Sequence, residues 1–320
     1  MSTIDTITAT EPALGSDRPI SKIGDRIFGG VSKGAGILIL VTLAAVTVFL
    51  VTEAWPAFTN DLTELDGGDT FLGYVGPLVF GTVLAALIAL AIATPMAIAV
   101  ALFITVYAPK RLSATLGSFV DLLAAIPSIV YGLWGITVLA PLLAGNVYPF
   151  LDERMSWLPF FSGPASTSGR TMLTAGVVLA VMILPIITAI SREAFRQTPR
   201  LHQEASLALG ATRWEMVRQT VLPYGRSSVV SGAMLGLGRA LGETMAVAVI
   251  LSPADVYSLN LISNQNSNTI AANIALKFPE SSGLEVNRLI ATGLVLFAIT
   301  FAVNAVARRI ARAGFSGAEG

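Results

Sequence analysis

The sequence predicts an all-α polytopic membrane protein with six transmembrane helices. Of the 320 residues, 54% are hydrophobic and only 12% are charged, about half the charged share of an ordinary soluble domain. Charged residues are also absent from blocks of about 20 residues, the length that a helix needs to cross a bilayer. This composition excludes a disordered chain, and the net charge of zero excludes a nucleic-acid binder driven by bulk charge.

Six blocks mark the predicted spans. Charge-free blocks cover residues 34–52, 70–109, 122–151, 171–191 and 289–307, and the block 227–254 contains only two charges, Arg239 and Glu243. The second block exceeds one straight span, so we expect tilt, a kink at Thr94–Pro95 or an extension beyond the membrane. Pro77 is expected at the start of this helix. Pro127 and Pro185 are expected to break the third and fourth spans.

Lys and Arg residues in the connecting segments predict the orientation. With a cytoplasmic N-terminus, 15 of these residues lie in inside segments, and four lie outside: Arg154, Arg170, Lys277 and Arg288. Because basic residues accumulate in cytoplasmic loops, both termini are predicted to be cytoplasmic. The outside loops at 144–170 and 252–287 are longer than turns require, so they either dock an external partner or cap the helix bundle.

Several chemistries are excluded by residue type. The chain has no Cys and one His, His202, which excludes disulfides and His-based metal sites. No Lys follows a Gly, so the chain has no phosphate-binding P-loop. We therefore expect a protein that is not an enzyme and has no catalytic residue, metal site or cofactor of its own. Residues 1–33 lack the features of a secretory signal.

The cytoplasmic segment 198–223 is predicted to form two short helices, the second of which ends at Pro223. Pro199 suits a helix start and Gly210 a helix end, while Thr212 and Glu215 form a capping box for the second helix. A DNA-binding helix-turn-helix is disfavoured because both ends of the pair are attached to the bilayer. The helices must bury one face against the membrane surface, the bundle or a cytoplasmic partner.

This segment resembles the coupling loop of ABC importer permeases. The matching residues are Glu204-Ala205-Ser206, then Gly210 after three intervening residues, and Leu222-Pro223. Ser206 and Thr220 replace the Ala and Ile that are usual in the motif. In that family the loop docks into a groove of an ATPase subunit. The resemblance therefore implies that Glu204, Ala205 and Gly210 lie at this contact.

The two charges of the fifth block are expected to lie inside the membrane. Arg239 is 11 residues beyond Ser228, about 16 Å along a helix, and Glu243 follows one turn later on the same face. Burial at this depth costs on the order of 2.5–3.5 kcal/mol per charge. Two compatible interpretations stay open. The charges neutralise one another, or Arg239 presents its guanidinium to an anion that crosses the membrane while Glu243 holds the guanidinium in place.

Other residues near these charges have less specific interpretations. Gly232, Gly236, Gly238 and Gly242 form small-xxx-small patterns, which predict close helix packing at a subunit or pathway interface.

Asp121 is expected at the start of the third span, where it complements the helix dipole, with gating as the less favoured alternative. Tyr131 supplies a hydroxyl either to a pathway or to a carbonyl that Pro127 leaves free.

A second resemblance is more specific. Gly238–Ala246 and Ala125–Trp134 are similar to signatures of phosphate importer permeases, in which the residues matching Arg239 and Glu243 are implicated in phosphate passage. The resemblance covers roughly residues 71–310. It implies a type I ABC importer permease fold and translocation of inorganic phosphate by alternating access. The N-terminal tail and long outside loops resemble the C-type permease more than its A-type partner.

This family resemblance implies an organisation and partners. The expected segments are a cytoplasmic tail (1–33), a first span with an outside loop (34–70), a permease core (71–310) with coupling loop 192–226, and a tail (311–320). The implied partners are an A-type permease, two ATPase subunits that bind ATP and Mg, an external phosphate-binding protein and the lipid of a prokaryotic plasma (inner) membrane.

Two alternatives to phosphate import stay open. One is an importer permease for sulfate or molybdate. The other is an ion-coupled secondary transporter that uses Glu243 or Asp121 as a proton site.

Overall fold

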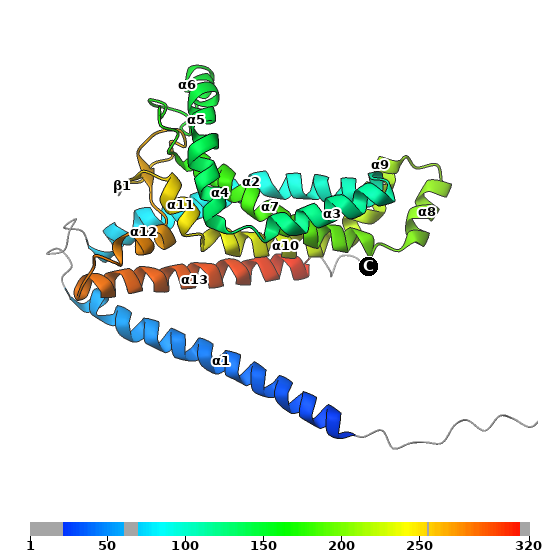
Figure 1. Cartoon of the computed structure of the whole chain (residues 1–320), viewed down its shortest axis with the longest axis horizontal. Helices are drawn as coiled ribbons and strands as arrows, with labels where there is room; N and C mark the ends of the chain where they lie inside the picture. The colour runs from blue at the N-terminus through cyan, green and yellow to red at the C-terminus, as the bar shows by residue number, and fades with distance from the viewer. Residues whose placement is uncertain (1–21, 61–69, 255, 314–320) are drawn as a thin grey trace, which may run out of the picture. The chain divides into compact units, whose positions relative to one another are not determined.

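The computed structural model describes residues 22–60, 70–254 and 256–313, most of which are helical (Figure 1). The helices are α1 (Lys22–Thr59), α2 (Phe71–Leu102), α3 (Lys110–Ala124), α4 (Ser128–Trp134), α5 (Ala140–Leu142), α6 (Tyr148–Met155), α7 (Met172–Arg196), α8 (Arg200–Ala208), α9 (Arg213–Met216), α10 (Leu222–Leu241), α11 (Met245–Ile250), α12 (Ile270–Lys277) and α13 (Leu284–Ala313). Four π-helical turns extend or join them: η1 (Phe103–Tyr107), η2 (Gly135–Leu139), η3 (Leu143–Val147) and η4 (Val217–Val221). Most of the predicted tails, 1–21 and 314–320, lies outside the described residues.

The chain divides into two units within α1, between Phe49 and Leu50. The described part of the first unit is the helical stretch from Lys22 to Phe49. Residues 22–33 of this stretch belong to the segment predicted as a cytoplasmic tail. They are helical because the helix that carries the first apolar block continues into the polar sequence before it. The second unit contains the rest of α1 and all other helices.

Five helical segments are long and apolar enough to cross a membrane: Arg26–Thr59, Phe71–Tyr107, Ser128–Met155, Met172–Arg196 and Leu284–Val306. The fifth predicted span is not among them. Its counterpart, α10, contains Arg226 and Arg239 and is followed by a break before the short α11. The count of six spans and the cytoplasmic location of the termini therefore stay predictions.

The proline predictions are only partly confirmed. Pro127 separates α3 from α4, as expected. Pro77 and Pro185 instead lie inside the continuous helices α2 and α7, so the predicted helix start at Pro77 and the predicted break at Pro185 are wrong. Pro95 also lies inside α2, and the helical stretch from Phe71 to Tyr107 has 37 residues, so the second block is one long helix as the expected extension requires. α2 buries one alanine per turn over this stretch: Ala85, Ala89, Ala93, Ala97 and Ala101. Because these side chains are small, neighbouring helices pack closely along α2 on both sides of Pro95.

The core of the second unit lies between α2, α7 and α10. The predicted glycine packing is confirmed for two positions, since a Cβ on Gly232 or Gly236 would meet Ile190 or Ile187 of α7. These glycines thus pack within the chain. Nothing outside α10 approaches the Cβ position of Gly238 or Gly242 within 4 Å among the described residues.

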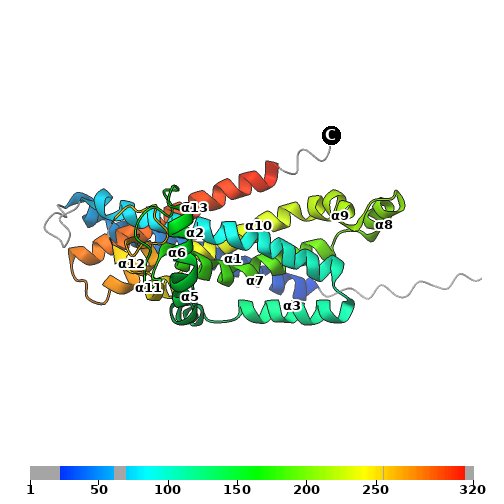
Figure 2. The ribbon, with the colours of Figure 1, turned by 90° about the horizontal axis from the view of Figure 1, so that it is seen from above.

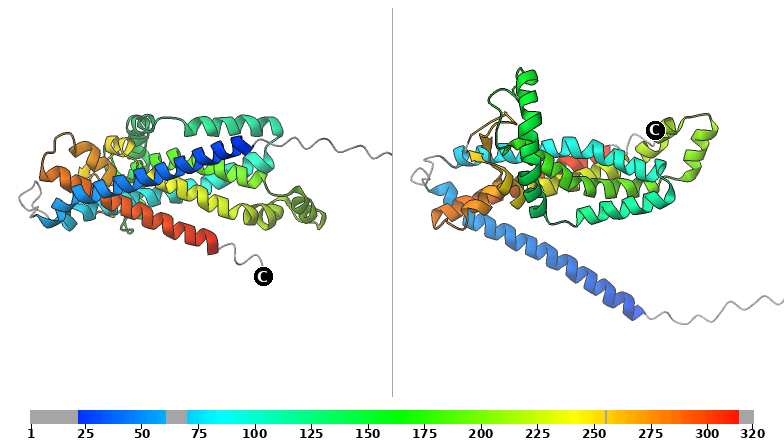
Figure 3. Two further views of the ribbon diagram at one scale, coloured as in Figure 1. Left: turned by 90° about the horizontal axis from the view of Figure 1, so that it is seen from below. Right: turned by 45° about the horizontal axis from the view of Figure 1, so that its top comes forward.

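Two further helical layers surround this core. α3 runs alongside α7 (Figures 1 and 2). The rod formed by α4, α5, α6 and their π-helical turns lies crosswise to α2, α7 and α10 (Figures 1 and 3). α4 packs against α11 so closely that a Cβ on Gly132 would lie 2.8 Å from the Cα of Ala246.

The two long loops that follow α6 and α11 pack against each other. Ser166 N donates to Ile262 O (2.8 Å), and Leu173 N donates to Leu261 O (2.9 Å). The strands β1 (Pro253–Ala254) and β2 (Asn266–Ser267) pair in parallel within the second loop. These contacts support the interpretation that the loops cap the bundle.

Gly81 provides a test of this cap. A Cβ at Gly81 of α2 would clash with Asn268 O, a backbone atom that cannot rotate away. We predict that Gly81→Ala lowers the stability of the purified chain by about 1–3 kcal/mol, the usual cost of overpacking. Gly145→Ala is the matched control, because its Cβ meets nothing within 4 Å. Thermal unfolding in detergent measures both, and equal midpoints would contradict the packing described.

Candidate functional site

The fifth predicted span is interrupted beside its two charges. α10 ends at Leu241, Gly242 adopts φ −94° and ψ 3°, and α11 begins at Met245. Glu243 is 8% exposed, and its Oε1 accepts a hydrogen bond from Ala246 N at 3.1 Å. The Glu243 side chain therefore caps the start of α11.

The break corrects the predicted geometry of the charged pair. Because the helix does not continue through Gly242, Glu243 is not on the same helical face as Arg239. The ion pairs among the described residues are Arg192–Asp121 and Arg288–Glu285, so Arg239 and Glu243 do not neutralise one another. Arg239 remains a partly buried cation near the end of α10.

α11 is held at its other end by a residue from a distant loop. Arg170 Nη2 donates to Leu251 O (3.1 Å) and to Val249 O (3.4 Å). A basic side chain that bonds the last carbonyls of a helix also complements its dipole. The short helix is therefore anchored by a carboxylate at its start and by a guanidinium at its end. The sequence assigned Arg170 only to an outside loop, because its partners lie far away in the chain.

Tyr131 of α4 bonds the turn between α3 and α4. Its hydroxyl donates to Leu123 O at 2.8 Å, and Ile126 N donates to the same carbonyl at 3.3 Å. The structure therefore uses this hydroxyl in the packing of the turn, although the carbonyl that it bonds is not left without a partner by Pro127.

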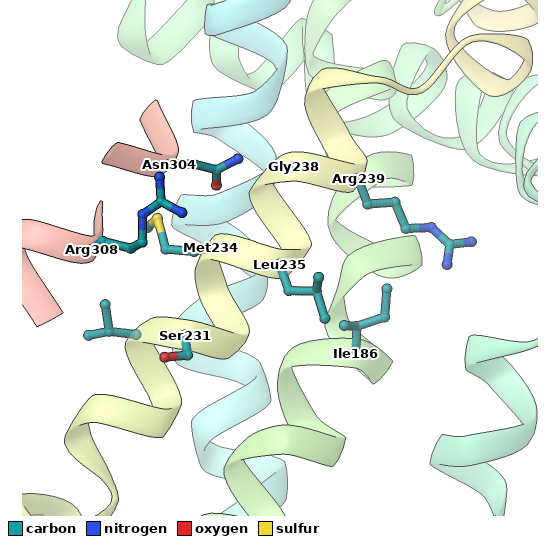
Figure 4. Close-up of a pocket in the computed structure, with 9 residues that line it drawn as sticks. Ile186, Ser231, Met234, Leu235, Gly238, Arg239, Asn304 and Arg308 are labelled. Carbon is teal, nitrogen blue, oxygen red and sulfur yellow. The ribbon is translucent and has the colours of Figure 1, made fainter. Parts of the chain in front are cut away.

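A groove of about 610 Å³ surrounds one stretch of α10 (Figure 4). Its lining comes from α7, α10 and α13: Ile186, Val230, Ser231, Met234, Leu235, Gly238, Arg239, Asn304 and Arg308. Two arginines and no acidic residue occur in this lining. Figure 4 shows that Arg239 and Arg308 extend on opposite sides of α10. The groove therefore presents positive charge at two separate places.

The predicted coupling loop has the expected two-helix form. α8 is followed by Gly210 with φ +87°, a left-handed conformation that favours glycine. Thr212 and Glu215 form the predicted capping box at the start of α9. The predicted end at Pro223 is wrong, because helical structure continues from α9 through η4 into α10, with Pro223 in the first turn of α10. Proline fits there because a first-turn N–H needs no helical partner.

The surface of this loop carries the residues predicted at an ATPase contact. Glu204, Ala205 and Gly210 are all exposed. Leu201 and Leu209 beside them are 76% and 90% exposed. A cavity of about 450 Å³ adjoins Gly210, Glu215 and Gln219. Exposed apolar side chains on an amphipathic loop indicate a surface that another molecule covers.

Asp121 does not lie at the start of a span. It belongs to the last turn of α3, and it binds Arg192 of α7 at 3.1 Å. The predicted dipole interaction is therefore wrong, since an acid near a helix C-terminus is unfavourable to that dipole. Arg192 lies over Gly117 of α3, where a Cβ would meet its Nη1. The pair joins α3 to the end of α7 that leads into the coupling loop.

A family model and several relatives match most of this chain. A family model described as "Binding-protein-dependent transport system inner membrane component" matches residues 93–313. The phosphate transport system permease protein PstC 2 of Mycobacterium tuberculosis is 46% identical over 315 residues, which cover 94% of this chain and 96% of that protein. The PstC protein of Mesorhizobium japonicum is 38% identical over 318 residues, 93% of this chain and 94% of that protein.

Solved structures support the fold. A bacterial alginate ABC transporter in complex with an alginate pentasaccharide-bound periplasmic protein contains a chain with a TM-score of 0.54 and 17% identity, covering 91% of this chain and 99% of that one. An inward-facing MetNI methionine ABC transporter gives a TM-score of 0.50 at 19% identity, covering 75% of this chain and 94% of that one. These likenesses confirm the expected all-α ABC permease fold.

Substitutions at Glu243 separate the capping role from a charge-pair role. Glu243→Ala removes the acceptor of Ala246 N–H in a buried place, so we predict a loss of about 1–3 kcal/mol in stability. Glu243→Gln keeps an acceptor oxygen and should lose much less. The measurement is thermal unfolding of the purified chain. Equal losses in both variants would instead indicate that the negative charge itself is required.

The capping box predicts a pH dependence in the coupling loop. Hydrogen bonds from Thr212 N (2.7 Å) and Thr212 Oγ1 (2.8 Å) lower the pKa of Glu215 below its usual value. The stabilisation is therefore present at neutral pH and is lost as pH falls through this lowered pKa. Amide exchange at the start of α9, corrected for intrinsic rates, should show lost protection in acid. Glu215→Gln cannot titrate and is the control; an identical acid response in that variant would refute the assignment.

Proposed function

The chain belongs to the family of binding-protein-dependent transport system inner membrane components, and we propose that it is a permease subunit of an ATP-driven phosphate importer. Relatives named as phosphate transport permeases match nearly its whole length. Its several apolar helices agree with a multi-pass protein of the inner membrane. Inorganic phosphate is then the substrate, and alternating access is the mechanism.

The substrate proposal rests on the surroundings of the Arg239 side chain. Its side chain is partly buried, lines a groove without acidic residues and has no ion-pair partner among the described residues. A guanidinium matches the oxygens of a phosphate with paired donors. A single cation at this place binds an anion weakly enough for release, as translocation requires. Glu243 then contributes to the pathway by fixing the backbone break beside Arg239.

Energy would enter through the coupling loop. The exposed residues Glu204, Ala205 and Gly210 are the proposed contacts with a separate ATPase, which would hold ATP and Mg. α7 leads into α8 through Pro199, and α9 continues into α10, which carries Arg239. A displacement of the loop would therefore reach both α7 and α10. The proposed assembly also contains an A-type permease, a second ATPase copy and an external phosphate-binding protein.

Two other functions differ from this proposal in measurable ways. An importer permease for sulfate or molybdate would share the loop and the fold but would move a different anion. An ion-coupled secondary transporter would work without ATP. Its candidate proton site at Asp121 is less suitable, because that carboxylate pairs with Arg192 near the cytoplasmic end of α7. The exposed coupling loop favours the ATP-driven importer.

Substitution of Arg239 tests the proposed anion pathway. In proteoliposomes that contain the full complex, we predict that Arg239→Gln lowers phosphate uptake at least about tenfold, because a hydrogen bond to a charged group contributes about 1.5–3 kcal/mol. ATP hydrolysis and complex assembly should persist. Arg239→Lys keeps the charge without the paired donors, so its uptake should be intermediate.

Three other results would revise the proposal. Unchanged uptake in Arg239→Gln would remove Arg239 from the pathway. A wild-type complex that moves sulfate or molybdate but no phosphate would identify another substrate. Uptake without ATP would indicate the secondary transporter.

A further inference from the structure

The groove around α10 contains a second group of polar side chains that the proposed pathway does not use. Asn304 and Arg308 are one helical turn apart on α13, so they share a face, and both line the groove. Figure 4 shows them together on the side of α10 that is opposite to Arg239. The part of the chain that the structure describes contains no ion pair of Arg308.

Among the described residues, no side chain or backbone group takes up the side-chain N–H donors of Arg308 and Asn304. The hydroxyl of Ser231, which also lines the groove, donates to Ser227 O at 2.9 Å. The guanidinium of Arg308 and the amide of Asn304 are therefore the groups that offer N–H donors there. Because no acidic residue lines the groove, the local charge favours an anion.

The position of these donors separates them from Arg239. Asn304 and Arg308 lie on one side of α10 and Arg239 extends on the other, so α10 itself stands between the two cations (Figure 4). A guanidinium fork next to an amide matches tetrahedral phosphate oxygens.

We propose that Arg308 and Asn304 form a second binding site for phosphate oxygens, which α10 separates from Arg239. Two sources supply this chemistry. One is the transported phosphate on its way out of the pathway, and this source rests on the proposed function. The other is the phosphodiester of an anionic membrane lipid, whose chains would lie on the apolar lining of Val230 and Met234. Basic grooves between helices on the cytoplasmic side bind such headgroups.

The test compares Arg308→Gln with Arg309→Gln. Arg309 is the next residue of α13, it is also exposed, and it does not line the groove. Both variants lose the same charge, so effects on membrane orientation cancel. Asn304→Asp is the second test variant, since it places a carboxylate beside Arg308 without a change of size. The full complex is assayed for phosphate uptake and ATP hydrolysis in liposomes with and without anionic phospholipid, and bound lipid is counted by native mass spectrometry.

The proposal expects one of two results. If transported phosphate is the ligand, Arg308→Gln and Asn304→Asp lower uptake several-fold in both liposome types, while Arg309→Gln does not. If lipid is the ligand, the two variants lose bound anionic phospholipid that Arg309→Gln retains, and their uptake matches wild type in liposomes without that lipid.

The proposal is overturned if all three variants agree in both uptake and bound lipid. A wild-type complex that moves no phosphate would overturn the proposed function instead. The lipid count would then still decide whether this site binds phosphate oxygens.

Discussion

The backbone break between α10 and α11 is the constraint on which the rest of the site depends. Within a bilayer, peptide groups have no water to bond, so a non-helical stretch persists only where protein groups or a cavity satisfy it. Here Glu243 bonds the first turn of α11, and Arg170 bonds its last carbonyls. Close packing of Gly132 against Ala246 then holds α11 against α4. Three separate parts of the chain thus maintain one short helix.

This arrangement determines which charges are available. Because Glu243 bonds the start of α11, Arg239 has no ion-pair partner among the described residues. A partly buried cation inside a membrane marks a candidate functional site. The proposed anion pathway therefore depends on the same backbone break that separates Glu243 from Arg239.

The predicted coupling loop is connected directly to the helices of this site. α7 and α10 pack through Gly232 and Gly236 with little space between them, and the loop joins the end of α7 to the start of α10. The ion pair Asp121–Arg192 attaches α3 to the same end of α7. Since Asp121 is largely exposed, this pair contributes only modest stability.

Local sequence signals determined much of this protein. The apolar blocks, the break at Pro127, the turn at Gly210 and the Thr212–Glu215 capping box depend on neighbouring residues, so they could be predicted. The end of α10, the partner of Asp121 and the two sides of the groove could not. Arg170 bonds carbonyls 79 and 81 residues away, and Asp121 pairs with a residue 71 positions later. A continuous helix through Gly242 and a capped break are both compatible with the same local sequence. Only the tertiary structure decides between them, because the groups that satisfy the broken backbone include ones from distant parts of the chain.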